Sequence, residues 1–300
     1  MWRNLIPFFY FFAILAPLLF PIFLQAEQAT TANQQTSDKW RYSLFNPTPR
    51  ELMREMSTDR PDQTESPYTV DAGHFQLEMD LVNYSYERYD SDKTTDQRTQ
   101  IWNVAPVNLK VGLLNNVDLQ IIFDSYLLEL TDDRTTKTKD QTSGHGDVTT
   151  RLKINVWGND GGSTAFAVMP FVKVPCSSAQ LGNDNIEGGI IFPLAIELPW
   201  GFGMGLMTQY DIVRNAFDDG YDVEFINTIT VSRDLIGNLG GYVEFFSATS
   251  SAKETDWAGT VDVGFTYAVT KDVQLDLGCN FGVTREAPDF NPFIGVSLRY

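Results

Sequence analysis

The chain has 300 residues, enough for one large domain or two small ones, and its 43% hydrophobic content excludes a wholly disordered protein. A net charge of −17, from 39 acidic and 22 basic residues, makes nucleic acids and anionic lipid surfaces poor partners. Aromatic residues make up 13% of the chain and glycine occurs 22 times, a composition that favours strands and turns over helices.

The first 26 residues have the features of a secretory signal peptide. Arg3 gives a positive start, residues 5–24 form an apolar run, and Ala26 supplies a small residue at the end of the segment. Because about 20 apolar residues can also span a bilayer, a transmembrane anchor is the alternative. Three prolines interrupt the run and polar residues follow it directly, so the sequence predicts a cleaved signal peptide and export.

Residues 27–72 form a polar, strand-poor leader that precedes the main domain. One short helix is expected within it, near residues 49–56. From residue 73 to the end the composition changes, and the remainder of the chain, residues 73–300, is predicted to be one domain.

Apolar and polar residues alternate throughout residues 73–300, which is the period of a half-buried β-strand. The first run covers residues 75–81. Eleven further runs of strand length follow, over residues 105–113, 119–123, 148–156, 166–172, 190–198, 202–206, 223–231, 239–245, 261–267, 273–283 and 294–300. The sequence therefore predicts an all-β domain of about 12 strands.

The connections between these strands alternate in length. Short turns are expected at residues 115–116, 158–162, 199–201, 234–238 and 270–272. Longer polar loops are expected at residues 89–98, 131–146, 175–187, 216–221, 249–256 and 286–291. An even number of strands with short turns on one rim and long loops on the other is typical of a transmembrane antiparallel up-and-down β-barrel, with both termini on the short-turn side.

The charged residues distinguish a membrane barrel from a soluble one, because a membrane barrel turns its apolar face outward. Charges inside the predicted strands oppose the apolar parity, and a cation on the lipid face would cost about 2 to 4 kcal/mol at the midplane. Twelve strands also enclose an interior too wide for side chains to fill. The candidates for lining a water-filled pore are Glu78, Asp80, Lys110, Asp124, Arg151, Lys153, Lys173, Glu197, Asp211, Glu224, Glu244, Asp262, Asp276 and Arg299.

Two stretches resemble a known family. They are Ser57–Glu78 (STDRPDQTESPYTVDAGHFQLE) and residues 146–175, which include GDVTTRLKINVWGNDGG and AVMPFVKVP. Both are similar to the "MetA-pathway of phenol degradation" family, and the resemblance covers residues 57–300. It implies an exported barrel that passes small hydrophobic or aromatic molecules through the outer membrane, and it implies no catalytic residues.

The leader has two interpretations that stay open at this point. Arg50, Arg54 and Arg60 precede a barrel whose predicted interior has an acidic excess, so the leader could plug the pore. It could equally be a periplasmic tether.

The last residue, Tyr300, ends the closing strand on an aromatic side chain. A terminal aromatic resembles the signal that barrel-assembly machinery recognises in outer-membrane proteins. Tyr300 is therefore predicted to be an assembly signal at the periplasmic interface.

The predicted function is a channel or transporter in the outer membrane of a Gram-negative-type bacterium. Its expected partners are outer-membrane lipids, the barrel-assembly machinery and small-molecule solutes, without nucleic acid, cofactor or metal. One alternative is a lipid or ester hydrolase, for which Ser143 and His145 are the nearest pair of nucleophile and base in the sequence. The other is a structural or surface-interaction barrel without transport. No enzyme activity is predicted.

Overall fold

The computed structural model describes residues 39–91, 95–178, 181–182, 185–215, 220–252 and 257–300. The predicted signal peptide, residues 1–26, and leader residues 27–38 lie outside this part of the chain. Its three helices are single 3₁₀ turns, η1 (Lys39–Arg41), η2 (Arg50–Leu52) and η3 (Pro199–Gly201). None of the described helices is long or apolar enough to cross a membrane. The helix expected near residues 49–56 is thus reduced to η2.

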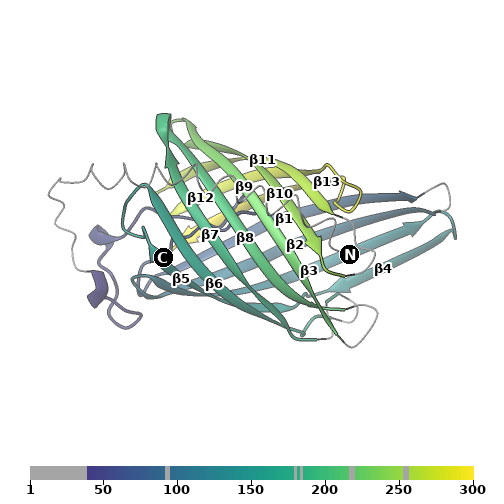
Figure 1. Ribbon diagram of the computed structural model, residues 1–300, viewed down its shortest axis with the longest axis horizontal. Coiled ribbons are helices and arrows are strands. Elements are labelled where there is room, and N and C mark those ends of the chain that lie inside the picture. Colours follow the sequence, from purple (N-terminus) through teal and green to yellow (C-terminus); the bar gives the residue numbers. More distant parts are fainter. Residues whose placement is uncertain (1–38, 92–94, 179–180, 183–184, 216–219, 253–256) are drawn as a thin grey trace. The chain divides into compact units, whose positions relative to one another are not determined.

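Thirteen strands follow the leader (Figure 1). They are β1 (Phe75–Ser91), β2 (Thr95–Leu114), β3 (Val117–Asp133), β4 (Thr138–Gly144), β5 (Val148–Trp157), β6 (Thr164–Val174), β7 (Glu187–Leu198), β8 (Phe202–Arg214), β9 (Tyr221–Ile236), β10 (Leu239–Ser250), β11 (Ala258–Thr270), β12 (Val273–Gly282) and β13 (Phe290–Arg299).

Twelve of these strands form a closed antiparallel barrel. β1 pairs with β2, β2 with β3, β3 with β5, and each later strand with the next as far as β13. β13 returns to pair with β1, where Leu77 lies opposite Leu298. At the seam, the Phe75 amide donates to the Tyr300 carbonyl at 3.0 Å and the Tyr300 amide donates to the Phe75 carbonyl at 2.8 Å. The prediction of a twelve-stranded up-and-down barrel is confirmed.

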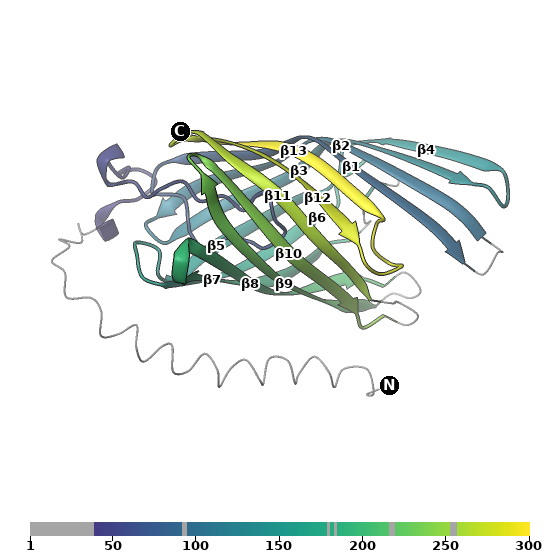
Figure 2. The same ribbon diagram turned by 90° about the horizontal axis from the view of Figure 1, so that it is seen from above.

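The thirteenth strand, β4, pairs only with β3 and lies outside the closed ring. The prediction of open loops at residues 89–98 and 131–146 was wrong, because β1 and β2 extend to Ser91 and from Thr95, and β3 and β4 form a hairpin. These polar strands are held by backbone hydrogen bonds, and their sequences lack the alternation of apolar and polar residues from which a strand is predicted. In Figures 1 and 2, β1 to β4 extend beyond the other strands at the long-loop end.

The two faces of the barrel wall have opposite polarity. On β11, Val261, Val263, Phe265 and Tyr267 are 37–49% exposed on the outer face, while Asp262 between them is 0% exposed. Because side chains alternate between faces of a strand, this pattern puts apolar groups outside and polar groups inside. An apolar outer face on a closed barrel is the arrangement of a transmembrane barrel, in which no strand edge meets lipid.

A register shift interrupts the alternation in β1. Between Asp80 and Val82 the pairing with β13 slips by one residue, so Leu81 is an extra residue in a β-bulge. The shift reverses the parity of the positions that follow. Tyr84 therefore packs on the ring of Trp102 at 4.5 Å between centroids, on the outer side, instead of sharing the inner face with Asp80.

Candidate functional site: the interior of the barrel

The strand register places the fourteen charged residues predicted to line a pore on the face opposite the apolar one. In neighbouring strands, Glu244 lies opposite Asp262 and Asp211 lies opposite Glu224. Many of the fourteen are not bathed in water, however. Lys153 and Glu244 are each 1% exposed, because another part of the chain covers them.

That covering part is the end of the leader, residues 57–71, which we call the luminal segment. It hydrogen-bonds or ion-pairs with inward-facing side chains of nine strands, namely β1, β2, β3, β5, β8, β9, β10, β11 and β12. In this way a segment without regular secondary structure satisfies most of the polar groups named here inside the barrel.

Asp59 is the most heavily paired residue of the luminal segment. Its two carboxylate oxygens lie 2.5 Å from Lys110 Nζ and 2.5 Å from Lys153 Nζ, and Lys110 also pairs with Glu78. Burial alone would raise the pKa of Asp59, but the two ammonium groups hold it well below its ordinary value of 3.8. This carboxylate therefore stays ionised and fixes the segment to β2 and β5.

On the other side of the interior the charges are reversed, because a cation of the segment, Arg60, contacts acidic residues of the wall. Its guanidinium pairs with Asp80 of β1 at 2.5 Å and with Asp276 of β12 at 2.6 Å. It also lies 5.7 Å from the centre of the Phe293 ring, a cation–π contact. Between the two strands Gly295 of β13 lies opposite both aspartates, and the guanidinium fills the space that a side chain there would occupy.

The other two leader arginines lie at the rim of the barrel. Arg54 donates to Asn115 at 3.0 Å and pairs with Asp160 at 3.0 Å, both in short turns. Arg50 pairs with Asp272, in another short turn, at 3.4 Å. Of the three arginines singled out in the sequence, only Arg60 reaches the interior.

The tip of the luminal segment meets an acidic part of the wall. The Gln63 amide donates to Glu244 at 2.7 Å, its side chain donates to Asp262 at 2.7 Å, and the Thr64 hydroxyl bonds to Thr228 at 2.6 Å. Beside them, burial raises the pKa of Asp62 to about 7, with further contributions from the charges of Asp59 and Glu65.

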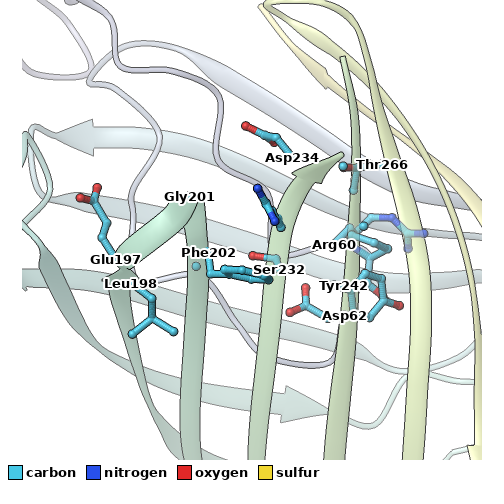
Figure 3. Close-up of a pocket in the computed structure, with 15 residues that line it drawn as sticks. Arg60, Asp62, Glu197, Leu198, Gly201, Phe202, Ser232, Asp234, Tyr242 and Thr266 are labelled. Carbon is cyan, nitrogen blue, oxygen red and sulfur yellow. The ribbon is translucent and has the colours of Figure 1, made fainter. Parts of the chain in front are cut away.

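Two cavities lie on either side of this tip, along β6 to β11. One, of about 490 Å³ toward the short-turn rim, is shown in Figure 3, with Glu197 and Leu198 on one side and Arg60, Asp62 and Tyr242 on the other. The second, of about 360 Å³ toward the long-loop rim, is lined by Phe171 and by the charged residues Lys173, Glu187, Asp211, Arg214 and Glu224.

Sequence reasoning missed an apolar cluster on the inner wall between these cavities. Met169 of β6, Ile191 of β7 and Met207 of β8 are 0–4% exposed, and Phe171 and Ile226 pack against them. β6 and β7 are apolar at both parities, so they give no alternation from which to assign an inner face. That continuous apolar character, in a barrel whose other strands alternate, is the signal that could have revealed the cluster.

The pair considered for hydrolysis is not assembled. Ser143 and His145 are both exposed, at the end of β4 and just after it. The His145 ring lies 3.3 Å from the Gly146 carbonyl, and its backbone amide donates to Ser178. Within the described residues no hydrogen bond joins Ser143 to His145, and no group of three or more His, Cys, Asp or Glu side chains could hold a metal ion.

Tyr300 lies at the short-turn end of the barrel, beside the start of β1. Its backbone closes the seam, while its side chain is 83% exposed. The His74 ring lies 3.3 Å from the Tyr300 carbonyl. An exposed aromatic side chain at this rim is available to a membrane interface or to another protein.

Comparisons with known proteins agree with this architecture. The family described as "Putative MetA-pathway of phenol degradation" matches residues 58–300. A search of curated proteins found no match. Among solved structures, an outer-membrane channel from Pseudomonas putida F1 is similar with a TM-score of 0.57 and 12% identity, over 81% of this chain and all of that one.

Two further solved structures have lower scores. The NanC porin has a TM-score of 0.48 and 11% identity over 74% of this chain and 98% of its own. The translocator domain of the autotransporter NalP from Neisseria meningitidis has a TM-score of 0.49 and 8% identity, over 75% of this chain and 88% of its own. At 12% identity, the similarity to the Pseudomonas putida channel is evidence for the fold and not for the function.

Proposed function

Because the chain belongs to the MetA-pathway of phenol degradation family, we propose that it is an outer-membrane channel for small molecules, with hydrophobic or aromatic compounds as its cargo. The observation that carries this proposal is the interior of the barrel. A closed wall with an apolar outside surrounds two cavities that open toward opposite rims, and an apolar cluster lies between them. A barrel with only a structural role would need no such interior.

The luminal segment supports a gated channel rather than an open pore. It fills the interior beside β1, β2, β3 and β5, and its tip separates the two cavities. In this proposal residues 57–71 are the plug, whereas Arg50 and Arg54 anchor the leader at the periplasmic rim. Passage of a solute then requires the tip, residues 62–65, to move away from β8 to β11.

The charged candidates divide into two groups under this proposal. Those that hold the luminal segment, such as Lys110, Lys153 and Asp276, act on the gate. Those that line the two cavities, Glu197, Lys173, Asp211 and Glu224, lie along the route that solutes take.

The proposal includes no enzyme activity, since the exposed Ser143 and His145 lack the hydrogen bond that would activate a serine nucleophile. It includes export by a cleaved signal peptide, contact with outer-membrane lipids, and insertion by barrel-assembly machinery that recognises Tyr300.

Two measurements test the proposal. Small phenols cross lipid unaided, so their uptake is best measured in whole cells, where lipopolysaccharide slows passive entry, with and without the protein. Faster uptake of phenol is expected in cells that produce it. In proteoliposomes, deleting residues 39–68 should increase the swelling rate in small sugars, because it removes the plug. Unchanged uptake and unchanged swelling would together contradict a channel function.

A further inference from the structure

The apolar cluster of Met169, Ile191 and Met207 faces a polar neighbour that does not suit it. The backbone amide of Glu65, at the tip of the luminal segment, points at Met207 Sδ from 3.4 Å. The Glu65 backbone therefore brings a carboxyl group close to this apolar wall, and burial raises the pKa of that group. A carboxyl group against an apolar wall is a poor match, because its desolvation is only partly offset.

Among the described residues, Glu65 forms an ion pair with Arg151 of β5. The Arg151 guanidinium also lies 6.0 Å from the centre of the Phe171 ring, at the edge of the cluster. Two buried atoms of this pair have no hydrogen-bond partner among the described residues. They are Arg151 Nε, whose N–H is a donor, and Glu65 Oε2, an acceptor.

We propose that the cluster and this ion pair form a binding subsite for a single-ring phenol. The ring lies on Met169, Ile191 and Met207, where the backbone of Glu65 now lies, and the hydroxyl group lies between Arg151 and Glu65. This assignment deepens the proposed channel function and rests on it.

The chemistry of the subsite selects this class of molecule. Thioether sulfur atoms and a phenylalanine edge make favourable contacts with an aromatic ring. A hydroxyl group can accept the Arg151 Nε–H and donate to Glu65 Oε2 at the same time, so it satisfies both unpartnered atoms. A plain hydrocarbon such as toluene would leave both unsatisfied, and a carboxylate would repel Glu65.

The subsite also accounts for the position of the plug. Glu65 and Thr64 stand between the two cavities, so a phenol that takes the place of the Glu65 backbone moves the tip away from β8. Binding of the cargo and opening of the route would then be the same event.

The test uses the full mature protein in detergent and follows 4-fluorophenol and 4-fluorotoluene by ¹⁹F NMR titration. Wild type is expected to bind 4-fluorophenol more tightly, by about tenfold, the worth of a hydrogen bond to a charged group. Arg151→Met should remove this preference, so that the two probes bind with similar affinity. Ile191→Asn should weaken both probes by about tenfold.

Matched controls lie away from the subsite. Arg233→Met changes an exposed arginine near the end of β9, which stacks on Phe202, and Ile122→Asn changes an inward-facing isoleucine of β3, opposite Asn108. Neither should alter the affinity for either probe. If Ile191→Asn does not give a heat-modifiable barrel, Ile191→Thr replaces it, with an expected loss of about threefold.

The assignment is overturned if wild type binds the two probes equally, or if Arg151→Met weakens both to the same extent. The channel function fails separately, through unchanged phenol uptake by cells and unchanged swelling after deletion of residues 39–68. A protein that transports phenol but shows no effect of Arg151→Met or Ile191→Asn would keep its function and lose this subsite.

Discussion

Asp59→Asn should release the luminal segment from the barrel. In the docked state this one carboxylate bridges Lys110 and Lys153, whose side chains are 2% and 1% exposed. After the change Lys110 keeps Glu78, but Lys153 keeps only the Tyr68 carbonyl, at 3.4 Å, among its hydrogen bonds in the described residues. An ammonium group is then buried without a carboxylate in contact with it.

The size of the effect follows from this loss. Removing one partner of a buried ion pair costs about 3 to 5 kcal/mol. Undocking the segment hydrates both lysines, so the cost applies to the docked state and not to the barrel. The docking constant should therefore fall by roughly two to four orders of magnitude.

Two assays report the docked fraction. Single-channel conductance in planar bilayers should rise, and a glutamyl endopeptidase should cleave after Glu65 faster than in wild type. Glu55→Gln removes the same charge from an exposed part of the leader and should change neither. Asp59→Asn combined with Lys153→Met should recover part of the docking, because the unpaired cation is gone. Wild-type conductance and cleavage in Asp59→Asn would refute the reasoning.

Three further changes test other parts of the molecule. Deleting Tyr300 should reduce the amount of heat-modifiable barrel in the outer membrane, and a normal amount would contradict its role as an assembly signal. Leu277→Arg, on the lipid face, should lower the free energy of unfolding in lipid vesicles by about 2 to 4 kcal/mol, and Thr266→Arg, in the cavity toward the short-turn rim, by much less. Burial raises the pKa of Asp62 from 3.8 to about 7. Between these pH values the docked leader holds a proton that the free leader releases, so docking should weaken as the pH rises from about 4 through 7. Asp62→Asn should flatten the corresponding rise in conductance, and an unchanged pH profile in that variant would exclude Asp62 as the cause.

Alternation was enough to predict the barrel, because a strand with one lipid face must repeat every second residue. Where the alternation is absent, the prediction failed. The extended hairpin of β3 and β4 depends on backbone hydrogen bonds, which any polar sequence can make. The bulge at Leu81 depends on pairing with a strand more than two hundred residues away.

The interior was harder to predict than the wall. β6 reads TAFAVMPFVKV, in which Phe166 and Met169 lie on opposite faces although both are apolar. A sequence of this kind fits either orientation, so the inner apolar cluster could not be assigned. Likewise, charge alone could not separate Arg60, which reaches the interior, from Arg50 and Arg54 at the rim.

The luminal segment docks through both an acidic and a basic residue. Attraction between arginines and an acidic barrel interior therefore explains only part of its docking. Asp59 and Arg60 are neighbours with opposite charges, and each meets the opposite charge on a different part of the wall, Asp59 at Lys110 and Lys153 and Arg60 at Asp276. A shift of one residue in one direction would bring Asp59 against Asp80 and Asp276, and a shift in the other direction would bring Arg60 against Lys110 and Lys153. The pairing therefore fixes the register of the segment as well as its affinity. The family match begins at residue 58, so it includes both residues together with the strands that hold them.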